Sequence, residues 1–93
     1  MAYQPETALE SFELRHPLDD WTPVAESLDL RDLEPPAPML EILAALGRLA
    51  PGQILEARLS RRPVFLLPRL EDQGHPYLLE PDRDEWRLRI KKV

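Results

Sequence analysis

The clearest hydrophobic pattern in the chain is a strict alternation close to its C-terminus. Trp86, Leu88 and Ile90 alternate with charged side chains, and this period of two predicts a half-buried strand over 85–91. Shorter runs of alternating or apolar residues predict three further strands. These strands are expected near residues 27–31, 53–59 and 76–80.

A longer segment carries apolar residues at helical spacing. Pro38 suits the first position of a helix, because no N–H donor is needed there, and Pro51 ends the pattern. We therefore expect a helix near 38–50, with Ala45 among the residues on its outer side. Its predicted inner face consists of Met39, Ile42, Leu43, Leu46 and Leu49.

A second helix is expected near 63–73, ending at Gly74. Pro68 falls inside this segment and removes one backbone hydrogen bond, so the pattern predicts a loose first turn or a kink there. The apolar residues predicted to face the sheet are Val64, Phe65, Leu67 and Leu70.

The resulting order of elements, β-α-β-α-β-β, predicts an α/β (α+β) two-layer sandwich. In this fold two helices cover one face of a four-stranded mixed sheet, and the other face is left to water or a partner. We expect residues 26–93 to form this domain. Apolar residues are sparse in 1–25, which we expect to be a flexible, acidic N-terminal arm unless Phe12 or Trp21 docks onto the domain.

Composition excludes several classes of function. A chain of 93 residues has room for one small core. It contains no cysteine, which excludes thiol nucleophiles, persulfide carriage and thiolate metal sites. A formal net charge of −5 disfavours general nucleic-acid binding. No apolar run approaches the roughly 18 residues of a membrane span, and the first residues are polar and acidic, so we expect a cytoplasmic protein without a secretory signal.

Little in the sequence indicates catalysis. Three glycines leave no glycine-rich phosphate loop, and no serine or threonine lies in a nucleophile-elbow pattern. His16 precedes two aspartates, but the prolines around it argue against the helix that such a metal site needs. His75 falls between a helix and a strand, where turn packing is favoured over chemistry. We therefore expect no enzyme activity, no metal site and no cofactor.

Clustered basic residues suggest an anion site. Arg61 and Arg62 immediately precede the second predicted helix, whose N-terminus favours anions. Arg58 and Arg69 lie nearby in the sequence, and the alternative interpretation is a solvated strand end. Basic residues of the last strand would line the open sheet face, where they either steer an acidic partner, including the chain's own arm, or prevent edge-to-edge pairing. These residues are Arg87, Arg89 and Lys91.

The segment Leu28–Met39 resembles the opening motif of the TusA/SirA-like proteins, in which a strand and a Gly-Leu turn lead through Cys-Pro-x-Pro into the first helix. Pro36 and Pro38 match the two prolines of this motif, Pro35 stands where the family's cysteine stands, and Asp32 replaces its glycine. Further matches are Pro51-Gly52, Leu67-Pro68 and Gly74-His75.

This resemblance covers about residues 27–91 and implies the same order of elements. TusA-like proteins carry sulfur as a persulfide on the cysteine of the motif, whereas Pro35 offers no sulfur. The resemblance therefore implies membership of a cysteine-less, Pro-Pro-x-Pro branch of uncharacterised bacterial domains. It also implies recognition through the Leu33–Met39 loop and the N-terminus of the first helix, where the related carriers meet their partners.

We therefore expect a non-catalytic protein-interaction or binding module with an unidentified protein partner. The alternative is an accessory that binds a small anion or metal, through the paired arginines or the turn histidine, and serves an enzyme of redox, sulfur or nitrogen-oxide metabolism. We expect neither nucleic-acid nor membrane binding, and at most a weak homodimer through the open sheet face or an edge strand. The candidate binding residues are Glu34, Pro35, Pro36, Pro38, Arg61, Arg62 and His75.

Overall fold

The structure is a computed structural model that describes residues 21–93. The predicted order of elements is confirmed, whereas the interpretations of His16 and of most of the 1–25 arm lie outside the described residues. The strands are β1 (Val24–Asp29), β2 (Ile54–Leu59), β3 (Tyr77–Asp82) and β4 (Glu85–Lys91), and the helices are α2 (Ala37–Arg48) and α3 (Leu66–Gln73).

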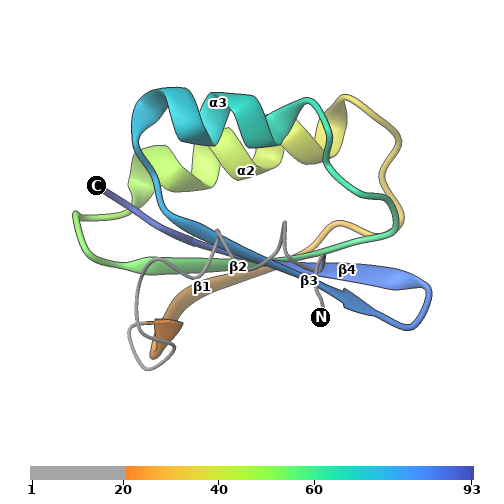
Figure 1. Cartoon of the computed structure of the whole chain (residues 1–93), viewed down its shortest axis with the longest axis horizontal. Helices are drawn as coiled ribbons and strands as arrows, with labels where there is room; N and C mark the ends of the chain where they lie inside the picture. The colour runs from red at the N-terminus through yellow and green to blue at the C-terminus, as the bar shows by residue number, and fades with distance from the viewer. Residues whose placement is uncertain (1–20) are drawn as a thin grey trace, which may run out of the picture.

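The four strands form one mixed sheet in the order β1-β2-β4-β3. β1 runs parallel to β2, while β4 runs antiparallel to both of its neighbours, β2 and β3. Both helices lie on the same face of this sheet (Figure 1). The predicted two-layer sandwich is therefore confirmed.

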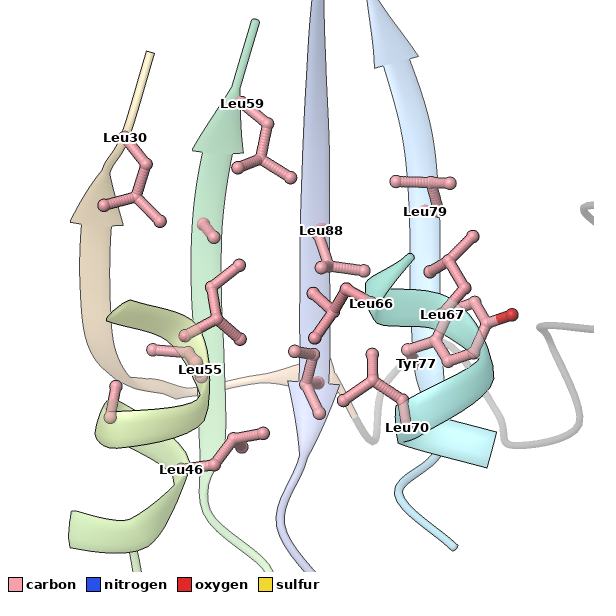
Figure 2. Close-up of a cluster of buried hydrophobic side chains, with 14 residues drawn as sticks. Leu30, Leu46, Leu55, Leu59, Leu66, Leu67, Leu70, Tyr77, Leu79 and Leu88 are labelled. Carbon is pink, nitrogen blue, oxygen red and sulfur yellow. The ribbon is translucent and has the colours of Figure 1, made fainter. Parts of the chain in front are cut away.

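The core lies between the helices and the covered face of the sheet. Ile90 pairs with Leu55 on one side and Tyr77 on the other, and Leu88 lies between Ala57 and Leu79 in the same way. All of these side chains are buried, and they meet leucines from both helices (Figure 2). Shortening one such leucine to alanine typically costs about 2–5 kcal/mol, so this layer supplies much of the fold's stability.

A smaller cluster lies on the opposite face of the sheet. Trp21 is only 1% exposed and packs with Ile54 and Leu78. The Lys91 ammonium lies 5.8 Å from the centroid of its ring, and the Arg89 guanidinium donates a hydrogen bond of 3.1 Å to its carbonyl oxygen. Trp21 therefore docks onto the sheet and ties the start of the described chain to it.

Strand β1 begins three residues earlier than the pattern indicates. Its pairing with β2 shifts register between Val24 and Glu26, so an irregularity interrupts the alternation of side chains. Apolar and polar residues therefore do not alternate regularly around Ala25, and the sequence pattern misses the start of the strand. The expected strand near 27–31 is corrected to Val24–Asp29.

The inner face of α2 also differs from the prediction. Ala45 is fully buried, together with Ile42 and Leu46, although we expected it on the outer side. A methyl side chain contributes little to a hydrophobic pattern, yet it fits where a helix approaches a sheet closely. The inner face is therefore wider than the large apolar residues indicate.

The start of α3 is the largest correction. The helix begins at Leu66 rather than near residue 63, and Val64 and Phe65 are exposed instead of facing the sheet. The N–H groups of Leu66 and Leu67 both donate to the carbonyl oxygen of Pro63, at 3.1 and 3.2 Å. Pro68 comes next and has no N–H with which to continue this pattern. The irregular turn that precedes α3 agrees with the expected loose first turn.

The third strand is longer than expected. It continues through Pro81 to Asp82, and only Arg83 and Asp84 form the turn into β4. Arg83 has a φ of 60°, the left-handed conformation typical of such short hairpin turns. Within residues 21–93, neither helix has the length and apolar character needed to cross a membrane.

Candidate functional site: a hollow between two loops

The parallel pairing of β1 and β2 brings two distant loops together. Because both strands point the same way, the loops that follow them leave the sheet at the same edge, a common location for ligand sites in open α/β sheets. A hollow of about 450 Å³ lies between these loops and the starts of α2 and α3. Its lining is Leu30, Leu33, Pro35, Pro36, Pro38, Met39, Leu59, Ser60, Arg61, Arg62, Pro63, Val64, Phe65 and Leu66.

The floor of the hollow is apolar and firmly held. Leu30 follows the end of β1, Leu59 ends β2 and Leu66 begins α3, and all three side chains are buried in the core. Four prolines line the walls, and each fixes its own φ angle. The hollow is therefore preformed, which lowers the conformational cost of binding.

The rim carries exposed apolar side chains. Leu33 is 39% exposed, Val64 52% and Phe65 80%, and all three line the hollow. Neighbouring exposed apolar residues mark interaction or ligand sites more often than isolated ones do. The sequence analysis assigned Val64 and Phe65 to the core, although Phe65 lies at helical spacing from Pro68 and Arg69, on the outer side of the helix.

Positive charge surrounds the mouth of the hollow. The Arg62 guanidinium carbon lies 5.9 Å from the centroid of the Trp86 ring, and a guanidinium nitrogen of Arg61 lies 4.0 Å from a carboxylate oxygen of Glu34, both side chains being well exposed. No acidic residue of the described chain lines the hollow, and neither helix has one in its first turn. The electrostatics therefore favour an anionic group.

Most of the predicted binding residues meet at this place. Five of them line the hollow, and Glu34 lies beside it through its contact with Arg61. The five are Pro35, Pro36, Pro38, Arg61 and Arg62. The loop and the arginine pair, which lie about 25 residues apart in the sequence, thus form one site.

His75 lies apart from the others. It follows α3, whose other end borders the hollow, and its Nδ1 accepts a hydrogen bond of 3.2 Å from the backbone N–H of Val93. Its side chain is buried, and this desolvation, followed by the charge of Lys92, lowers its pKa. This geometry favours turn packing over a shared role in binding.

The basic residues of the open sheet face have partners within the chain. Glu85 accepts hydrogen bonds from Arg31 at 2.6 Å and Arg58 at 2.8 Å, and these contacts lower its pKa. Farther along the face, Arg89 pairs with Glu56 at 3.1 Å, and Arg87 pairs with Asp82 at the same distance. Because these charges are already paired within the chain, they favour the prevention of edge-to-edge pairing over the attraction of an acidic partner.

The remaining candidates add no second site. Arg69 is exposed on α3 and does not line the hollow. Between Trp21 and Val93, no group of three or more metal-ligating side chains gathers.

Comparison with known proteins identifies the fold. A family model described as "Uncharacterized conserved protein (DUF2249)" matches residues 27–92. The crystal structure of a SirA-like protein from Desulfitobacterium hafniense matches with a TM-score of 0.63 and 17% sequence identity, over 71% of this chain and 95% of that chain. Such a similarity shows the fold alone, and it confirms the expected SirA/TusA-like architecture. No curated protein matches the sequence.

Proposed function

This chain belongs to the DUF2249 family of uncharacterized conserved proteins, and we propose that it is a non-catalytic module that binds a protein partner. The proposed contact surface is the rim of the hollow, formed by the β1–α2 and β2–α3 loops. One observation carries the proposal: Leu33, Val64 and Phe65 expose apolar side chains side by side around a preformed hollow.

The exposure of Phe65 is costly for a protein without a partner. An aromatic side chain that is 80% exposed stabilises no core, yet aromatic residues commonly provide a large share of the binding energy at interfaces. The surrounding prolines hold the rim in place before binding. These features support a docking surface.

The resemblance to the sulfur carriers supports the same surface. In those proteins the corresponding loop carries the reactive cysteine and meets protein partners, and Pro35 takes that position here. With no cysteine in the sequence, the loop retains its place on the scaffold without thiol chemistry. Recognition of a partner is the role that such a loop still supports.

Site-specific photocrosslinking tests this proposal. A photoreactive phenylalanine analogue replaces Phe65 in the full chain, which is expressed in cells of the organism that produces the protein. The matched control carries the analogue at Leu40, which is exposed on α2 but does not line the hollow. We expect a discrete crosslinked protein from position 65 and none from position 40. Leu33→Asp in the same chain should abolish the crosslink, because a charge then occupies the apolar rim.

The crosslinked partner, once identified and purified, allows a direct measurement of affinity. Phe65→Ser should weaken binding at least tenfold, whereas Leu40→Ser should leave it unchanged. Equal crosslinking from positions 65 and 40, or no crosslink from position 65, would contradict the proposed surface.

A further inference from the structure

The hollow is large enough to hold a small molecule. Its volume of about 450 Å³ lies within the range of roughly 300–1,000 Å³ that is typical of small-molecule sites. At roughly 30 Å³ each, it holds about 15 water molecules. Because Leu30, Leu59 and Leu66 offer those waters no hydrogen bonds, their displacement by an apolar body is favourable.

The mouth of the hollow carries positive charge. Among the described residues, Arg61 and Arg62 are the only charged ones in the lining. Within residues 21–93, no carboxylate lies within ion-pair distance of Arg62, whose guanidinium lies over the face of the Trp86 ring. Stacking on a ring leaves the N–H donors of a guanidinium available for a planar anion.

The second arginine is nearly as accessible. Arg61 faces Glu34 across 4.0 Å, and both side chains are strongly exposed, so their attraction is weak. A ligand carboxylate therefore competes with Glu34 at little cost. Ser60 also lines the hollow, and its hydroxyl is a further potential hydrogen-bond donor next to the arginines in the sequence.

From this combination we propose that the hollow binds a free organic acid in its carboxylate form, with an unbranched apolar chain. The chain lies against the leucine and proline walls, and the carboxylate lies at the mouth with Arg62 and Arg61. A carboxylate suits this site because its two oxygens match the fork of a guanidinium. This activity goes beyond partner recognition and does not depend on it.

A titration with alkyl carboxylates tests the proposal on the full chain. Hexanoate, octanoate and decanoate are added to isotope-labelled protein, and the backbone amide signals are followed by NMR. We expect saturable shifts around Leu33, Phe65 and Leu66, with affinity rising about fourfold for each added methylene while the chain fits the hollow. Octanol, which has the same chain length without the charge, should bind at least tenfold more weakly than octanoate.

Matched variants test the role of the charge. Arg62→Gln should lower octanoate affinity about tenfold, while Arg69→Gln, an exposed arginine of α3 outside the lining, should leave it unchanged. Both substitutions lie at the surface, and the unshifted amide signals of the sheet confirm that each variant is folded.

Three outcomes would overturn the proposal. These are the absence of saturable shifts with decanoate, equal affinity for octanol and octanoate, and an Arg62→Gln variant that binds octanoate as well as the parent chain. The affinity for octyl phosphate is measured in the same way. Tighter binding of octyl phosphate than of octanoate would overturn the proposed carboxylate and indicate a phosphate ester as the ligand. Crosslinking from position 65 tests the protein partner separately, so failure of one proposal is distinguishable from failure of the other.

Discussion

At the scale of single residues, helical spacing decides the role of Phe65. Pro68 and Arg69 follow it by three and four residues, and both are exposed on the outer face of α3. Phe65 flanks the start of the helix in a helical conformation, so its side chain continues this outer face. Phe65 therefore lies at the rim of the hollow and not at the expected core position.

His75 gives a prediction for the dependence of stability on pH. Burial lowers its pKa in the folded chain below the ordinary value of 6.5, so the unfolded chain binds a proton more readily between these two values. The free energy of unfolding therefore falls as the pH drops from about 6.5 toward the lowered value, and this loss is absent above 6.5.

We expect His75→Gln to show a smaller loss of stability than the parent chain between pH 7.5 and pH 5.5. Urea unfolding at the two pH values measures it, and His16, which is present in both proteins, cancels in the comparison. An equal loss in the parent and the variant would show that His75 does not titrate differently on folding.

At the scale of elements, the ends of the helices depend on backbone conformation as much as on side chains. Gly74 ends α3 with a φ of 79°, and its N–H contacts the carbonyl oxygens of Leu70 and Glu71. Only glycine adopts this conformation without strain. Gly47 lies within α2 instead, where the same lack of a side chain weakens the helix.

These two glycines predict opposite effects of the same substitution. A Cβ atom at either position would meet no atom within 4 Å, so backbone conformation alone sets the sign. Gly74→Ala should lower the free energy of unfolding by about 1–2 kcal/mol, and Gly47→Ala should raise it by about 0.5–1 kcal/mol. Urea unfolding of both variants checks this, and effects of equal sign would refute the argument.

At the scale of the whole molecule, the two apolar clusters share their strands. Ile54 belongs to the Trp21 cluster, while its neighbour Leu55 belongs to the main core, and the same holds for Leu78 and Leu79. Adjacent residues of a strand point to opposite faces. Loss of packing in one cluster therefore disturbs the strands that carry the other cluster.

We therefore expect the chain to unfold in one cooperative transition. The variant Trp86→Phe retains Trp21 as its one tryptophan, so fluorescence reports on the smaller cluster, while circular dichroism at 222 nm reports on the helices. The two urea midpoints should coincide. A fluorescence transition at lower urea would show instead that the Trp21 cluster opens independently of the main core.

The sequence by itself determined the order of elements, the inward side chains of β4 and the fold class. Each of these follows from a local period of two or of about 3.6 residues, which burial of one face imposes on a strand or a helix. The arginine pair was also chosen from a local signal, its position before a helix, whereas the loop at Pro35 was chosen because its prolines resemble the motif of the TusA/SirA-like proteins.

Only the tertiary structure decided which of these residues belong together. Parallel pairing of β1 with β2 brings the loop of Pro35 beside Arg61 and leaves His75 at the other end of α3. Close packing placed Ala45 in the core, and docking buried Trp21 on the open face. Such outcomes depend on contacts between residues far apart in the chain, and a local pattern of hydrophobicity carries no information about them.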